Sequence, residues 1–121
     1  MTIDEFLYQS ADALRNGDYL LPEVVLAAID ESRDSLEELG EKLESDPSPP
    51  GLEGLDEALM EAYNLFADAL DLLEVAVEED IPELSAEILS RTQDARETLR
   101  EVRRQAENHN TALQEETGMR G

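Results

Sequence analysis

Cysteine is absent from this sequence of 121 residues, and histidine occurs once, as His109. Without cysteine the chain can form neither disulfides nor thiolate metal sites. One histidine cannot supply the two Glu-x-x-His pairs of a di-metal carboxylate bundle. The sequence also contains no Gly-x-Ser-x-Gly turn, EF-hand loop or glycine-rich phosphate loop. We therefore expect a protein that is not an enzyme, with no catalytic, cofactor-binding or metal-ligating residues.

Aromatic residues make up only 4% of the chain, and long apolar runs are missing. A core this poor in rings must be built from aliphatic side chains and alanine, which suits helix-on-helix packing. The first residues are acidic where a signal peptide needs basic ones, and the most apolar stretch, residues 19–29, is too short to cross a bilayer. These absences predict a cytoplasmic protein with no membrane partner.

Positive charge is scarce as well, with 9 basic residues against 31 acidic ones and a net charge of −22. Such a surface repels nucleic-acid phosphates and anionic membranes, so neither is expected as a partner. Two explanations of the charge stay open. It can serve solubility alone, or it can attract a basic protein partner.

Three clusters of turn residues divide the chain into four helical segments. The clusters are Asn16-Gly17-Asp18, Asp46–Gly51 and Asp80-Ile81-Pro82. They predict an all-α fold, an antiparallel bundle of three long helices plus a short N-terminal helix. Residues 1–113 are expected to form a single domain, and residues 114–121 a frayed polar tail.

Capping signals refine two of these boundaries. Thr2 with Glu5, and Asp80 with Glu83, each fit a capping box at the start of a helix. Pro82 leaves open whether the last two helices form a hairpin or one long kinked helix that would need a dimer partner. We favour the hairpin.

The second predicted helix has its apolar positions at alternating steps of three and four residues, as in a coiled coil. These positions are Val25, Ile29, Ser32, Leu36, Leu39 and Leu43. The third helix has two adjacent apolar rows, one from Leu55 to Val77 and one from Ala58 to Ala76. One neighbouring helix cannot cover so broad a face. We therefore expect the third helix to be central, in contact with two or more helices of its own chain or of a second copy.

Charge is distributed unevenly between the last two helices. Residues 52–80 hold ten acids and no base, whereas residues 81–113 hold six acids and five arginines. Arg96, Arg100 and Arg103 follow one flank of the fourth helix, beside its apolar stripe. Antiparallel packing is expected to bring this arginine ridge near the acids of the third helix.

The third helix also carries the predicted partner-binding residues. Leu65, Leu72 and Ala76 are the expected apolar contacts, and Glu61, Asp68 and Asp71 the expected acidic rim. A broad apolar face next to uncompensated acids is typical of surfaces that take up an amphipathic or basic helix. The alternative interpretation is that the three apolar residues belong to an ordinary core.

One pattern of acids suggests a different activity. Glu37-Glu38-Leu39-Gly40-Glu41, followed by Glu53-Gly54-Leu55-Asp56, resembles the Glu-Glu-x-x-Glu … Glu-x-x-Asp signature of MazG-type nucleotide pyrophosphohydrolases. The resemblance implies an all-helical, Mg-dependent enzyme that cleaves nucleoside triphosphates. At 100° per residue, however, the three glutamates of residues 37–41 lie opposite the apolar seam of their helix, so they do not converge on a shared cavity.

We therefore expect a small acidic helical module for protein–protein interaction, acting as a chaperone, adaptor or inhibitor on a basic or amphipathic protein partner. Three alternatives remain. The chain can be a self-associating structural module that forms a homodimer, a nucleic-acid mimic whose carboxylates imitate phosphates, or a MazG-like pyrophosphohydrolase.

Overall fold

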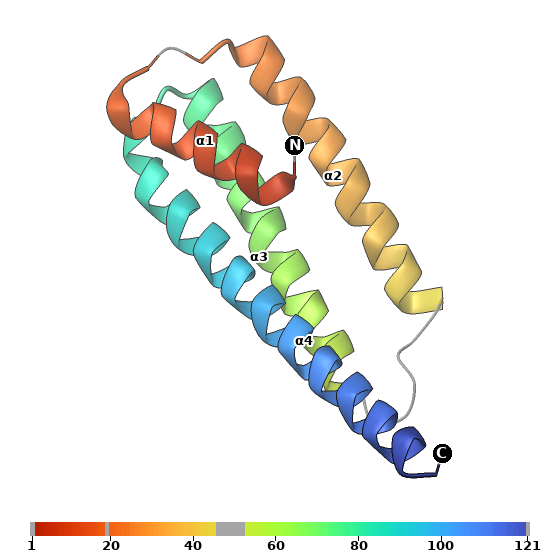
Figure 1. The fold of residues 1–121 in the computed structure, drawn as a ribbon. Helices are drawn as coiled ribbons and strands as arrows, with labels where there is room; N and C mark the ends of the chain where they lie inside the picture. The colour runs from red at the N-terminus through yellow and green to blue at the C-terminus, as the bar shows by residue number, and fades with distance from the viewer. Residues whose placement is uncertain (1, 19, 46–52, 121) are drawn as a thin grey trace.

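The computed structural model describes residues 2–18, 20–45 and 53–120, and it has the predicted all-α architecture. Helix α1 spans Ile3–Asn16, α2 spans Pro22–Ser45 and α3 spans Glu53–Glu78. A single 3-10 turn, η1 at Pro82–Leu84, precedes α4 at Ser85–Arg120. The four helices pack against one another as an antiparallel bundle (Figure 1).

Local signals set the ends of α1. The Glu5 backbone N–H donates to the Thr2 side chain at 3.4 Å, which is one limb of the expected capping box. At the other end Gly17 adopts φ 76°, a left-handed conformation that glycine reaches without steric cost. The Asp18 N–H then donates to the Ala13 carbonyl at 2.8 Å and closes the helix end.

The expected capping box at Asp80 is wrong. Asp80 lies in the left-handed region, with φ 55°, and takes part in the turn instead of capping the next helix. Behind it the Ile81 N–H donates to the Ala76 carbonyl at 3.0 Å, which closes the C-terminal end of α3. Pro82 then opens η1, and α4 follows from Ser85. Asp80 and Glu83 have the spacing of a capping box, but that spacing does not indicate that Asp80 itself belongs to the turn between α3 and α4.

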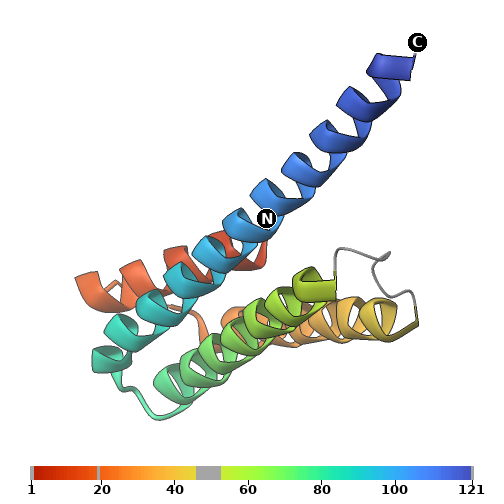
Figure 2. The same cartoon turned by 90° about the horizontal axis from the view of Figure 1, so that it is seen from below.

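The α3–α4 hairpin is confirmed, and α3 is the central helix. It packs against α1, α2 and α4, and its contact with α4 is the most extensive in the molecule. Helix α1 packs on both α4 and α3, whereas α2 depends mainly on α3. The broad apolar face of α3 is therefore shared among three helices of its own chain (Figures 1 and 2).

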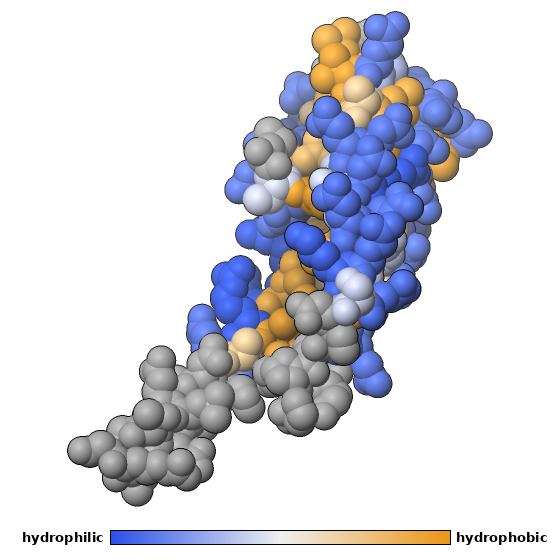
Figure 3. Space-filling view, turned by 90° about the vertical axis from the view of Figure 1, so that its right-hand side faces the viewer, coloured by the Kyte–Doolittle hydropathy of each residue, from blue (hydrophilic) through white to orange (hydrophobic). Residues whose placement is uncertain are grey.

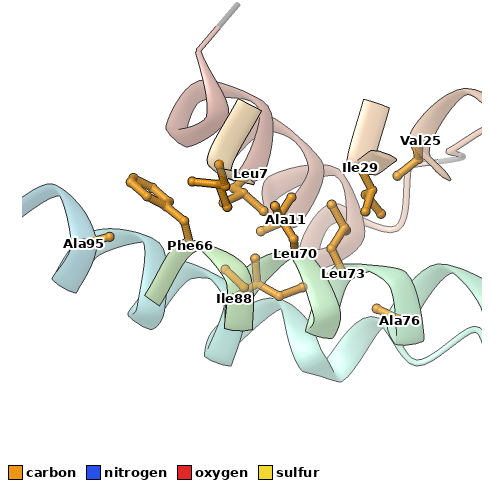
Figure 4. Packing of buried hydrophobic residues seen from close by; sticks show 12 residues of the cluster. Leu7, Ala11, Val25, Ile29, Phe66, Leu70, Leu73, Ala76, Ile88 and Ala95 are labelled. Atoms are coloured by element: carbon orange, nitrogen blue, oxygen red, sulfur yellow. The ribbon is translucent and has the colours of Figure 1, made fainter. Parts of the chain in front are cut away.

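The core shows the register between α3 and α4. In Figure 4, Ala95 lies beside Phe66, and Ile88 lies beside Leu70 and Leu73. Ala69 is fully buried in the same cluster, and a small side chain there lets the two helices approach closely. The main cluster is made of Leu7, Ala11, Val25, Ile29, Leu36, Phe66, Ala69, Leu70, Leu73, Ala76, Ile88 and Ala95.

The bundle is covered unequally along its length. Val25, Ile29 and Leu36 on the α2 seam are buried, but Leu39 is 41% exposed. Helix α4 has 36 residues against 26 in α3, and its C-terminal end projects past the rest of the bundle (Figure 2). Residues 114–120, which the sequence assigns to a frayed tail, continue this helix. No helix in the described residues has the length and apolarity needed to cross a membrane.

Candidate protein-binding surfaces

Three of the six predicted partner-binding residues come together around one hollow on α3. Glu61, Leu65 and Asp68 line an open depression of about 580 Å³ near the N-terminal half of that helix. Asp56, Glu57, Met60 and Asn64 complete its described lining. We call these seven residues the acidic hollow. Met60 was not among the predicted residues, although it lies one helical turn from Glu57 and from Asn64.

The acidic hollow combines apolar and anionic surface. Met60 is 36% exposed, which is high for a large apolar side chain, and Leu65 is half-buried against the core. Glu57, Glu61 and Asp68 are exposed, and none forms an ion pair within the described part of the chain. An apolar floor beside the carboxylates of Glu57, Glu61 and Asp68 can seat a helix that carries basic side chains beside an apolar stripe.

The other three predicted residues do not belong to this hollow. Ala76 is 1% exposed and lies in the main core, so it cannot contact a partner that docks on the surface. Leu72 is half-buried against the same core. Asp71 is exposed, but it is held by Arg33 of α2. The apolar row of α3 was therefore partly ordinary core, as the alternative interpretation proposed.

Arg33 links α2 to α3 through two carboxylates. Its guanidinium donates to Glu74 and to Asp71, each at 2.6 Å. These hydrogen bonds, first from Glu74 and then from Asp71, raise the pKa of Arg33 above its usual value. Arg33 therefore stays charged at all physiological pH values, and Asp71 serves the packing of α2 on α3.

A second surface lies next to the N-terminal end of α1. The Asp4 carboxylate forms an ion pair with Arg96 Nε of α4 at 3.2 Å, and the Arg96 guanidinium carbon lies 4.8 Å from the centre of the Tyr8 ring. These contacts place the first turn of α1 at the level of Arg96. The expectation that this arginine pairs with acids of α3 is wrong, because α1 lies on that flank of α4.

Beyond Arg96 the described part of the bundle contains only α2, α3 and α4. On this part of α4, Leu99 is half-buried against the main cluster, and Val102 is half-buried one turn further along. We call the apolar side chains of this region the open trough; its members are Leu39, Leu43, Leu59, Leu99 and Val102. Figure 3 shows an apolar strip between hydrophilic surfaces on this side of the molecule.

Among the described residues, the acids of the MazG-like pattern do not gather into a metal site. Glu37, Glu38 and Glu41 are all exposed on α2. Within the described residues no group of three or more His, Cys, Asp or Glu side chains is arranged to hold a metal ion. The side chains of Glu53 and His109 lie outside the described residues.

Comparison with protein-family models, curated proteins and solved structures gave no match to this chain. The interpretation of both surfaces therefore depends on their geometry and charge.

Proposed function

We propose that this chain is a non-catalytic protein-interaction module of the cytoplasm that binds a basic amphipathic helix in the acidic hollow. The observation that supports this most strongly is the coincidence of exposed Met60 and half-buried Leu65 with the carboxylates of Glu61 and Asp68. The apolar pair supplies contact area, and the carboxylates select a partner of positive charge.

The charge of the whole molecule favours the same class of partner. A net charge of −22 attracts basic proteins over distances longer than any single contact, and this raises the rate of encounter. At physiological ionic strength the Debye length is about 8 Å, so charges remote from the hollow are largely screened once the partner is bound. Specific binding must then depend on the acids of the hollow itself.

The test is fluorescence polarisation with a labelled helical peptide that carries a leucine stripe and lysines. Removing two charges in the hollow by Glu61→Gln and Asp68→Asn should weaken binding about tenfold. Glu23→Gln with Glu31→Gln is the matched control, because it removes two exposed acids on α2. Its effect should stay below about twofold. Equal losses in the two double variants would show that only the overall charge matters and would contradict a site at the hollow.

A homodimer is the second candidate, because Leu39 and Met60 are exposed apolar residues that a second copy could cover. Sedimentation velocity distinguishes the two cases. A monomer at micromolar concentration supports an interaction module, whereas a dimer that dissociates on Met60→Ser would assign the acidic hollow to self-association.

A further inference from the structure

The bundle has its fourth helix, α1, along only part of its length. Helix α1 has 14 residues, about 21 Å of helix, whereas α3 has 26 residues, about 39 Å. Because the first turn of α1 is fixed at Arg96 by Asp4 and Tyr8, no described helix covers the space between α2 and α4 beyond that level. The open trough lies in this space, along the line that α1 would follow if it were longer.

The α4 wall of the trough is basic. A hollow of about 220 Å³ is lined by Asp4, Arg96, Leu99, Arg100 and Arg103. Arg96 is neutralised by Asp4, whereas Arg100 and Arg103 are exposed and form no ion pair with any described residue. Glu97, one turn before Arg100, and Glu107, one turn after Arg103, are the acids nearest to them along α4.

The α2 wall is of mixed charge, because Glu38 lies one turn before Lys42 on the same flank of the helix. At 100° per residue, Lys42 lies beside Leu39 on the trough side of α2, and it has no ion pair among the described residues. Glu37, Glu41 and Glu44 lie on the opposite side of the helix, which is also the side of Arg33. The positive charge beside the trough therefore comes mainly from Arg100 and Arg103 on α4.

We propose that the open trough is a second binding site, separate from the acidic hollow, and that it takes an amphipathic helix of a partner protein with acidic side chains. The apolar face of that helix packs on Leu39 and Leu99 and completes the four-helix cross-section. Its carboxylates face Arg100 and Arg103, which lie one and two turns beyond Arg96 on α4. These contacts are of the same kind as the ion pair between Asp4 and Arg96.

The negative charge of the molecule opposes this partner at long range, but it does not decide the bound state. In 0.15 M salt, charges more than about 8 Å away are largely screened. The arginines at the rim are in direct contact range of a docked helix and are screened less. An acidic helix is thus expected to associate slowly and to be held by local contacts, which is the reverse of the behaviour expected at the acidic hollow.

The experiment measures polarisation of a labelled helical peptide with a leucine stripe and glutamates, in 0.15 M NaCl, with the full chain. Arg100→Glu should weaken binding about tenfold, because an attraction becomes a repulsion. Arg15→Glu changes the net charge equally at an exposed site on α1 and should change affinity less than twofold. Leu39→Ser should weaken binding about fivefold, whereas Val24→Ser, at a large apolar residue that is 62% exposed on the first part of α2, should have no effect. Circular dichroism checks that each variant folds.

Equal losses from Arg100→Glu and Arg15→Glu would overturn the proposal, and so would failure of the glutamate peptide to bind the unaltered chain. A dimer that Leu39→Ser dissociates would also overturn it, because a second copy would then occupy the trough. Binding of the lysine peptide to the unaltered chain and to the Glu61→Gln, Asp68→Asn double variant reports on the acidic hollow. Failure at one surface therefore leaves the result at the other intact.

Discussion

The two halves of the bundle are built from the same three long helices but differ in how their apolar surface is covered. In the half next to the α3–α4 turn, α1 supplies a fourth helix, and Leu7, Leu70 and Ile88 are fully buried. In the far half no described helix takes that place, and Leu39 is 41% exposed. Stability therefore depends mainly on the half next to the α3–α4 turn, which we call the hairpin half, whereas the far half has apolar surface left for binding.

Truncating a leucine in each half gives the largest expected difference. Leu70→Ala removes a fully buried side chain and should lower the free energy of unfolding by about 3 kcal/mol. Leu39→Ala removes a side chain already in partial contact with water and should cost less than about 1 kcal/mol. Urea unfolding followed by circular dichroism measures both. Similar costs would show that the two halves are equally packed.

The close approach of α3 to α4 provides the next test. Ala69 is fully buried in the hairpin half, so Ala69→Leu forces extra methylenes into a filled interface and should destabilise by about 2 kcal/mol. Ala58 lies in the far half and is only half-buried. Ala58→Leu should therefore change stability by less than about 0.5 kcal/mol. If Ala58→Leu proves as costly as Ala69→Leu, the helices are as tightly packed in the far half as near the turn.

A smaller effect is expected at the turn itself. Asp80 adopts φ 55°, where a side chain costs energy that glycine avoids. Asp80→Gly should raise the free energy of unfolding by about 0.5 kcal/mol. Asp80→Asn removes the same charge but keeps a side chain. Comparing the thermal unfolding of the two variants therefore separates the effect of backbone strain from that of charge repulsion. An equal gain from both variants would assign the effect to charge.

Much of the fold could be predicted from the sequence, because local signals set it. Gly17 and Pro82 mark breaks, and the two apolar rows of α3 indicate a helix with several neighbours. The position of α1 could not be predicted, because it depends on how Leu7 and Ala11 pack against helices distant in the sequence. Arg96 was expected near the acids of α3 but pairs with Asp4 of α1, for the same reason.

The candidate site was predicted in part. Glu61, Leu65 and Asp68 do line one hollow, because they follow one another around a single helix. Ala76 and Asp71 could not be excluded from sequence, since burial in the core and pairing with Arg33 are both tertiary contacts. The open trough was not predicted at all, because it depends on the different lengths of α1 and α3.

Thiol labelling tests the contrast between the two halves most directly, because the natural chain has no cysteine. Single cysteines at Leu59 and Val102 report on the far half, and cysteines at Leu73 and Ile88 report on the equivalent pair in the hairpin half. We expect the first pair to react within about tenfold of a free thiol, and the second pair at least about a thousandfold more slowly, because their exposure requires unfolding. Uniformly slow labelling at all four positions would contradict an open far half.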